Sequence, residues 1–271
     1  MCGRYSQAKD PATLAEEFDA VDATEGAWPG PEHNVAPTTT VIAVVDRHPR
    51  DGAGKADPQR LERSLRAMRW GLVPGWADDP KVGSRMINAR SDSLTSKPAF
   101  RRAAKGRRCL LPADGWFEWQ RDGPGGRKVP YFITLPGGRS IAFAGLWETW
   151  RPKDAPKGTL GPGDGPLIST TVVTIDAAGP LTAIHHRMPL VLPAERWKAW
   201  LDPDNDDPTD LLEPPPPELL TSFELRQVST KVNNVKNHGP ELLEETHDEP
   251  EQVGLDLDID RDLEADVPAT Q

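Results

Sequence analysis

The residue with the most distinctive chemistry in this sequence is Cys2. We expect removal of Met1 to leave Cys2 at the amino terminus, where a free α-amine stands beside the thiol. Such an amine has an ordinary pKa of about 7.7 to 8.0, so about a tenth or more is neutral at pH 7 and can form an imine with an aldehyde. The thiol can then add to the imine carbon and close a thiazolidine ring, and a nearby Arg4 would favour the thiolate. In the alternative interpretation, Cys2 is only a small buried apolar residue.

Glu118 and Asn88 are further candidates for catalysis. Glu118 lies between Phe117 and Trp119 in an apolar stretch, and strand geometry would place its side chain on the same face as Trp116. A partly desolvated carboxyl group has a raised pKa and can act as a general acid or base near neutrality. The amide of Asn88 can hold a polar substrate through its donor and its acceptor together. The alternatives are an outward-facing glutamate on an amphipathic strand and a turn asparagine.

Adjacent imidazoles occur at His185 and His186, followed by Arg187. On an extended segment His185 and Arg187 share a face, so the imidazole could move protons while the guanidinium binds an adjacent phosphate. His186 should then point elsewhere. The alternative is a core histidine with a satisfied hydrogen bond, and the sequence leaves open which of the two histidines acts.

Cations and aromatic residues alternate in several places, a combination that supports binding of single-stranded nucleic acid. Residues 100–108 contain five cations in nine positions and could form a phosphate-binding ridge. Trp70 and Trp76 could stack on bases, and Arg90 suits a phosphate oxygen. The alternative is a solvated basic face.

Metal and nucleotide sites find no support in the spacing of residues. The sequence has no CxxC or HxxxH pair, no GxGxxG after a predicted strand and no GxxxxGK[ST] loop. We therefore expect neither a metal nor another cofactor.

The charge of the chain is concentrated near its carboxyl end. Residues 244–271 contain eleven acidic residues and one arginine, which accounts for the whole net charge of −10 and leaves a neutral body. A segment so charged and without aromatic residues is typical of disorder. The sequence thus predicts one domain over residues 2–243 and a disordered acidic tail over 244–271.

Composition excludes several classes of protein. No apolar run approaches the roughly 18 residues that a membrane span needs, and the first residues lack the charged and apolar regions of a signal peptide. Two cysteines cannot form a disulfide framework. We expect a cytoplasmic monomer with free thiols and no membrane partner.

The elements that must position these residues are mostly strands. Apolar runs bounded by glycine and proline predict strands at residues 40–45, 68–73, 109–119, 131–135, 140–147 and 170–175. Helical spacing occurs at residues 11–18, 97–104 and 193–201. Residues 47–60, 151–165 and 202–218 have the composition of linkers. The pattern favours an α+β domain around a curved or barrel-like mixed sheet, with a few short helices.

Eight motifs in one order carry a resemblance to a known family. They are Cys2-Gly3-Arg4-Tyr5, Asn34-Val35-Ala36-Pro37-Thr38, Arg69-Trp70-Gly71-Leu72-Val73-Pro74, Asn88-Ala89-Arg90, the stretch from Cys109 to Trp119, Phe143-Ala144-Gly145-Leu146-Trp147, His185-His186-Arg187-Met188-Pro189 and Val232-Asn233-Asn234. Together the motifs resemble the SOS response-associated peptidase family, whose members process abasic sites. The resemblance implies a compact β-rich domain that binds single-stranded DNA and traps abasic sites as a thiazolidine crosslink. On binding DNA, such a protein would associate with the nucleoid.

The resemblance also implies roles for individual residues. Cys2 resembles the covalent nucleophile, Asn88 the group that positions the opened sugar, and Glu118 and His185 the acid-base groups. The residues that resemble DNA contacts are Arg4, Arg90, Thr174 and Arg187. The family name implies autoproteolysis before the cysteine, but here only Met1 precedes it and ordinary methionine removal would suffice.

Two other classes of function compete with this interpretation. A terminal cysteine whose own amine acts as the base would suit a peptidase or amidohydrolase of the N-terminal-nucleophile type. A single-stranded-DNA-binding module in which Cys2 is incidental would use only the cations and aromatic residues. A lyase activity from the imine would accompany the crosslinking interpretation.

Overall fold

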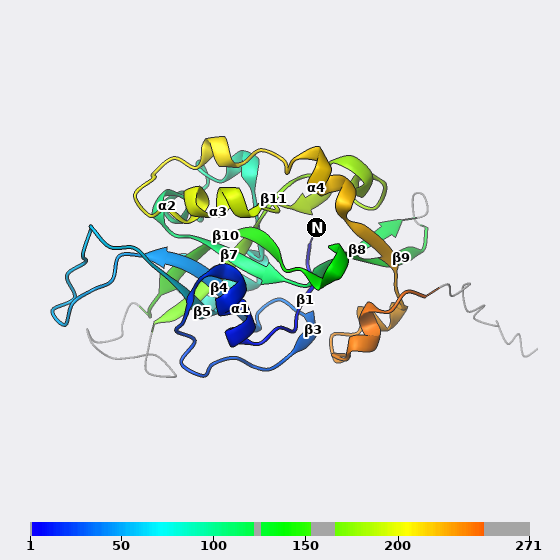
Figure 1. Cartoon of the computed structure of the whole chain (residues 1–271), viewed down its shortest axis with the longest axis horizontal. Coiled ribbons are helices and arrows are strands. Elements are labelled where there is room, and N and C mark those ends of the chain that lie inside the picture. Colours follow the sequence, from blue (N-terminus) through cyan, green and yellow to red (C-terminus); the bar gives the residue numbers. More distant parts are fainter. Residues whose placement is uncertain (1, 122–125, 153–165, 247–271) are drawn as a thin grey trace, which may run out of the picture.

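The computed structural model describes residues 2–121, 126–152 and 166–246. Its α-helices are α1 (Pro11–Phe18), α2 (Arg101–Gly106), α3 (Ala194–Leu201) and α4 (Pro217–Ser222). Its strands are β1 (Tyr5–Gln7), β2 (Val21–Asp22), β3 (Glu32–Val35), β4 (Thr40–Arg47), β5 (Glu62–Trp70), β6 (Asn88–Arg90), β7 (Arg108–Ala113), β8 (Gly115–Arg121), β9 (Lys128–Thr134), β10 (Ile141–Trp150), β11 (Leu167–Asp176), β12 (Arg187–Pro189) and β13 (Glu224–Gln227). Within the described ranges, seven short 3-10 helices, η1 to η7, connect them. Strands outnumber α-helices among the described residues, as the sequence predicts (Figure 1).

Five long strands close into a ring. The order is β11, β10, β7, β4 and β5, and the ring closes where β5 pairs in parallel with β11 at Arg69 with Ser169 and Trp70 with Thr170. The remaining pairs around the ring are antiparallel, so the sheet is mixed, and the buried faces of its strands fill the interior. The predicted barrel-like mixed sheet is therefore confirmed.

A second, smaller sheet carries the amino-terminal strand. Its order is β13, β9, β8, β1 and β3, all antiparallel, with Glu118 of β8 directly opposite Tyr131 of β9. Tyr5 of β1 lies opposite Trp116 of β8, and this pairing fixes the position of the preceding residues. The strand predicted over 109–119 is two strands, because the chain leaves the ring at Asp114 and enters the second sheet.

Aromatic side chains join the two sheets. The Tyr5 ring makes edge contacts with Trp70, at 5.1 Å between centroids, and with Phe143, at 5.9 Å. Trp116 makes an edge contact with the same Phe143 at 5.7 Å. All four rings are fully buried, so one continuous core holds β1 against the ring.

The predicted helices and loops agree with the structure within a few residues. The first helix has the predicted bounds, because Asp10 caps it by accepting from the N–H groups of Ala12 and Thr13. Most of the predicted linker over 151–165 lies outside the described residues. Chain contacts continue two to three residues into the predicted tail: Glu245 bridges Val228, and the Thr246 N–H donates to the Gln227 carbonyl. The remainder of that tail lies outside the described residues.

The described helices also bear on membrane insertion. None of them combines the length and the apolar character that a transmembrane segment requires.

Candidate active site

Cys2 lies three residues before the start of β1 and is fully buried. The Asn88 side-chain amide donates a hydrogen bond from Nδ2 to the Cys2 carbonyl, at 2.7 Å. Asn88 begins β6, which β11 holds by parallel pairing of Val172 with Asn88 and of Thr174 with Arg90. Two residues 86 positions apart in the sequence are thus brought together by the ring, as the predicted site requires.

The Asn88 amide has a second polar atom in the same buried environment. Its Oδ1 is buried and has no hydrogen-bond partner in the described part of the protein. A buried acceptor without a partner is costly. This atom therefore offers a hydrogen-bond acceptor to a hydroxyl or amine of a bound molecule.

Glu118 supplies a carboxyl group close to Cys2. Glu118 is 3% exposed, and burial raises the pKa of its carboxyl group from the ordinary 4.5 to about 7. A carboxyl with that pKa exchanges a proton readily near neutral pH. The prediction that Glu118 is desolvated in its apolar strand is confirmed, and the outward-facing alternative is wrong.

The Cys2 thiol differs from the expected thiolate. Burial, and then the negative charge of Glu118, raise the pKa of Cys2 well above its ordinary value. Arg4 offsets these effects only in small part, through a backbone hydrogen bond. Its guanidinium is engaged elsewhere, donating to Asn34 Oδ1 at 2.8 Å and to the Val232 carbonyl at 2.9 Å. The thiol is therefore held in its protonated form.

His185 lies in the turn between η4 (Gly179–Ala183) and β12. His185 Nδ1 lies 2.9 Å from the Arg187 backbone nitrogen and 3.1 Å from the Arg187 carbonyl oxygen, so it can accept from the first or, when protonated, donate to the second. Burial lowers the pKa of His185 and favours the neutral ring. The His186 ring stacks on His185 with centroids 4.2 Å apart, which corrects the expectation that His186 points elsewhere. The segment is a turn at this point and not extended, so adjacent side chains can meet.

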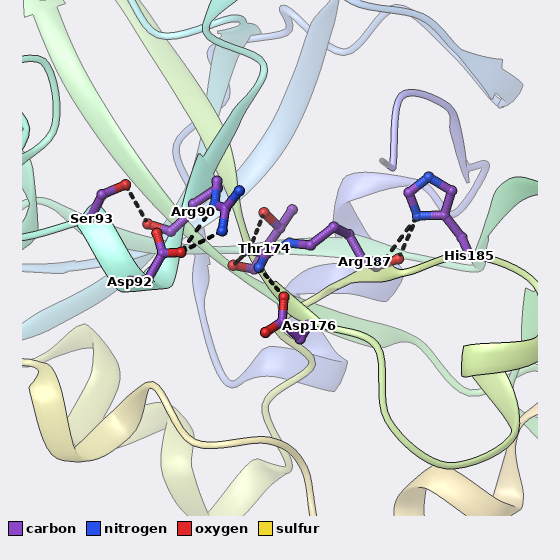
Figure 2. Close-up of polar contacts among 7 residues, drawn as sticks. All are labelled: Arg90, Asp92, Ser93, Thr174, Asp176, His185 and Arg187. Atoms are coloured by element: carbon purple, nitrogen blue, oxygen red, sulfur yellow. Dashed lines mark hydrogen bonds and ion pairs between the residues drawn. The ribbon is translucent and has the colours of Figure 1, made fainter.

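Two of the predicted phosphate contacts, Arg90 on β6 and Arg187 on β12, lie in separate groups of polar contacts, both drawn in Figure 2. Arg187 is 4% exposed, and its guanidinium donates to the Thr174 carbonyl at 2.5 Å and to Asp176 Oδ1 at 2.6 Å. Thr174 is fully buried beside it. Arg90 pairs instead with Asp92 at 2.5 Å, and both side chains are half exposed. Arg90 is thus accessible to a ligand, whereas Arg187 and Thr174 are buried and hydrogen-bonded to each other.

The two predicted stacking tryptophans have opposite environments. Trp70 is fully buried and its Nε1 donates to the Ile87 carbonyl at 2.9 Å, so the expected contact with DNA does not hold for it. Its ring instead positions the residue before Asn88. Trp76 is 56% exposed and borders a hollow of about 360 Å³ with Lys81 and Arg85. Trp76 remains available to stack on a base.

Asn34 is an organising residue for which the sequence alone predicts no role. Its Nδ2 donates to the Asn237 carbonyl at 2.8 Å and to the Asn234 carbonyl at 3.2 Å, and its Oδ1 accepts from Arg4. Asn34 therefore joins the segment after Cys2 to the carboxyl-terminal part of the domain. The sequence signal for this role was that Asn34 begins the motif over residues 34–38 and that Val232-Asn233-Asn234 forms another of the eight motifs.

The described residues contain no group of three or more histidine, cysteine, aspartate or glutamate side chains arranged to hold a metal ion. The site residues instead comprise one thiol, one amide, one carboxyl and one imidazole. The fold and these groups define a class: a closed-barrel domain that places a cysteine near its amino terminus against an amide and a carboxyl that titrates near neutrality.

The family model described as SOS response associated peptidase (SRAP) matches residues 1–235, and the chain belongs to this family. It is 36% identical over 244 residues to the abasic site processing protein YoqW of Bacillus subtilis (strain 168), covering 90% of this chain and 99% of that relative. It is 32% identical over 261 residues to the abasic site processing protein HMCES of Gallus gallus, covering 87% of this chain and 69% of that relative.

Solved structures share the fold. A protein from Bacteroides thetaiotaomicron has a TM-score of 0.71 at 20% identity, over 90% of this chain and 100% of that one. A protein from Bordetella bronchiseptica has a TM-score of 0.61 at 25% identity, over 84% of this chain and 100% of that one.

Proposed function

We propose that this protein captures abasic sites in single-stranded DNA by forming a thiazolidine crosslink through the α-amine and thiol of Cys2. The observation that carries the proposal is the hydrogen bond from Asn88 to the Cys2 carbonyl, beside a carboxyl group whose pKa is about 7. Relatives that are named abasic site processing proteins support the choice of substrate. The proposal requires that Met1 be removed, because only a terminal cysteine has both groups.

The first chemical step is opening of the sugar. An abasic nucleotide is mostly a closed furanose, and its aldehyde appears when the hemiacetal hydroxyl loses a proton and the ring oxygen gains one. Neutral His185 and Glu118 suit this transfer, since burial lowers the pKa of His185 and keeps the ring neutral and able to accept a proton, while the pKa of Glu118 is about 7. The unpaired Oδ1 of Asn88 accepts a hydrogen bond from the sugar hydroxyl that this step releases.

The second step joins the amine to the aldehyde. The Cys2 nitrogen attacks the carbonyl carbon to give a carbinolamine, and loss of water leaves an imine. Protonated Glu118 donates the proton with which the hydroxyl leaves as water. Asn88 fixes the orientation of the attacking residue through its carbonyl, so the reacting atoms meet without further ordering of the chain.

The third step closes the ring. The Cys2 sulfur adds to the imine carbon, and the thiol proton ends on the ring nitrogen, so the whole sequence releases one water. Because the thiol is held protonated, a base must take its proton, and ionised Glu118 is the nearby carboxylate. The reverse sequence, with Glu118 as acid, would open the ring again.

A lyase activity is part of the same proposal. The imine acidifies the adjacent carbon of the sugar, and loss of that proton allows β-elimination of the 3′ phosphate. Ring closure by the thiol removes the imine and so competes with strand cleavage. Arg90 and Trp76 are the accessible contacts for the flanking strand.

Intact mass spectrometry tests the proposal directly. The purified protein should lack Met1, and incubation with an abasic oligonucleotide should give a species of protein plus oligonucleotide minus one water. An oligonucleotide with all its bases is the control. An equal yield of adduct from Cys2→Ala protein would contradict the proposal. Turnover of a peptide panel without any adduct would instead favour the peptidase alternative.

A further inference from the structure

A cluster of arginines lies in a part of the molecule that the proposed site does not use. Arg47 ends β4, Arg66 lies in β5 and Arg107 directly precedes β7. The guanidinium carbons of Arg47 and Arg107 lie 5.1 Å and 5.8 Å from the ring centroid of Trp147. These cation–π contacts hold the two cations on one aromatic platform and limit their freedom.

The cluster encloses a hollow of about 360 Å³. Arg47, Arg50 and Arg66 line it together with Ser64 and Glu62. Burial lowers the pKa of Arg47, and the positive charges of Arg66, Arg50 and Arg107 lower it further. The cations therefore repel one another at this distance. A concave site with an excess of guanidinium groups is complementary to phosphate.

Acidic side chains neutralise only part of this charge. Glu148 forms an ion pair with Arg107. Glu62 lies across the strand ladder from Arg47, without an ion pair between them among the described contacts. Four arginines therefore face these two glutamates, and His48, which also lines the hollow, pairs with Asp204. The cluster thus carries an excess of positive charge, although the body of the chain as a whole is neutral.

Only part of the basic ridge expected at residues 100–108 extends this surface. Arg108 is 2% exposed, and it donates to the Ala104 carbonyl at 2.6 Å and the Asn205 carbonyl at 2.8 Å, so it cannot bind a ligand. Arg101, Arg102 and Lys105 of α2 are exposed. Helix α2 packs on β7 and β10, the strands that carry Arg107 and Trp147 to the cluster.

The cluster is far from Cys2. At its first residue, Thr40, β4 pairs with Arg69 of β5. The next residue of β5, Trp70, donates from its ring to the Ile87 carbonyl, directly before Asn88. Arg47 is seven residues further along the strand, or about 23 Å at roughly 3.3 Å per residue. Figure 1 shows the loop after β4 reaching away from the amino terminus, along the longest axis of the molecule.

We propose that the Arg47, Arg50, Arg66 and Arg107 cluster binds backbone phosphates of the DNA that flanks the abasic nucleotide. This inference rests on the proposed function for the identity of the polyanion. The acidic tail is the competing occupant, and it starts at a distance from the cluster. Thr246 is held by Gln227 of β13, which Figure 1 shows toward the other end of the long axis.

Salt-dependent binding of intact strands tests the proposal without any crosslinking. Arg47→Gln and Arg66→Gln are combined in the full-length chain, with Arg139→Gln as an exposed control on a different surface. Fluorescence anisotropy measures the affinity for an intact strand of about 40 nucleotides as a function of salt concentration. For this strand, the slope of log affinity against log salt should fall by about 1.4, because each phosphate contact to single strands contributes about 0.7.

Each outcome separates the possibilities. Loss of affinity in the double variant, with a smaller loss per charge in Arg139→Gln, supports the proposal, whereas unchanged affinity in the double variant overturns it. An equal loss per charge in Arg139→Gln also overturns it, since the cluster would then act only through the general field. If replacing the nine acidic residues of 248–266 by amides abolishes the loss, the cluster binds the tail and not DNA. Failure of adduct formation in the wild type would refute the proposed function without affecting these measurements.

Discussion

The two cysteines of this chain occupy two regions that differ in what surrounds the sulfur. Both residues are fully buried, and burial raises the pKa of both thiols. Cys2 lies against the Asn88 amide and within the electrostatic influence of the Glu118 carboxyl. Cys109 lies inside the ring wall, where the Thr170 hydroxyl is 3.3 Å from its sulfur. Burial there raises the pKa of the Cys109 thiol to about 12.

The comparison shows that burial alone does not distinguish a reactive thiol from an inert one. Around Cys109 the packing leaves no room for a substrate: a Cβ added at Gly145 would lie 2.9 Å from its sulfur. Around Cys2 the neighbours include an unpaired amide oxygen and a carboxyl that exchanges its proton near pH 7. Chemistry at Cys2 therefore depends on polar neighbours and on its position in the chain, and not on a preformed thiolate.

The largest expected effect comes from exchanging each cysteine in turn. Cys2→Ala should abolish the stable adduct with an abasic oligonucleotide, because without the sulfur the imine cannot close to a thiazolidine. Cys109→Ala should retain the adduct and lose about 1 kcal/mol of stability, as for other small deletions in a packed core. Cys2→Ser should still give an imine that borohydride traps. Gel mobility of the adduct, with and without borohydride, measures all three. A normal adduct from Cys2→Ala without borohydride would show that the Cys2 thiol is not the reactive one.

Glu118→Gln should slow adduct formation by about 10² to 10⁴, the usual contribution of a positioned acid or base. It should also change the pH dependence of stability. The folded pKa of about 7 exceeds the ordinary 4.5, so the folded state holds an extra proton between these values. Wild-type stability should therefore fall as pH rises through this window, by about 3 kcal/mol at most, while the variant stays flat. Urea titrations at pH 5 and pH 8 measure the difference.

A parallel pH dependence in both proteins would show that Glu118 does not titrate in this window. The matched control is Glu148→Gln, which removes another buried carboxyl, one that pairs with Arg107 away from Cys2. At a concentration of DNA that saturates the protein, this control should leave the rate of adduct formation unchanged, because any change at Arg107 then affects only binding.

Asn88→Ala should reduce the rate of adduct formation by about tenfold to a hundredfold, because the reacting residue loses its tether. The hydrogen bond itself contributes only about 1 kcal/mol to stability, so the fold should remain. Single-turnover kinetics on an abasic strand measures the rate, and anisotropy on an intact strand should show unchanged affinity. A loss confined to affinity would assign Asn88 to DNA binding instead of positioning.

Local pattern predicted most of the strands and the buried state of Glu118, since its neighbours Phe117 and Trp119 mark an apolar strand, the first four residues of which are buried. Local pattern failed where residues distant in the sequence meet. Trp70 is buried because β5 closes the ring against β11, a parallel contact between residues about 100 positions apart. The stacked histidines were missed for a different reason, because the turn that brings them together interrupts the expected extended segment.

The arginines show the same division between composition and contact. The sequence identified Arg4, Arg90 and Arg187 as cations near the motifs, but nothing local shows which of them is already occupied. Arg187 is occupied by Thr174 and Asp176, and Arg4 by Asn34 and Val232. Long-range hydrogen bonds therefore decide which predicted phosphate contacts remain available.

The smallest expected effect on activity comes from Thr170→Val, which changes the surroundings of the inert thiol alone. The Thr170 hydroxyl donates to the Leu146 carbonyl at 2.9 Å and lies beside the Cys109 sulfur. Its loss should cost about 1 kcal/mol in the free energy of unfolding. The rate of adduct formation should not change, since the hydroxyl contacts neither Cys2 nor its polar neighbours. A slower reaction in a stably folded variant would mean that the ring wall around Cys109 helps to position Cys2, and the two regions would then not be independent.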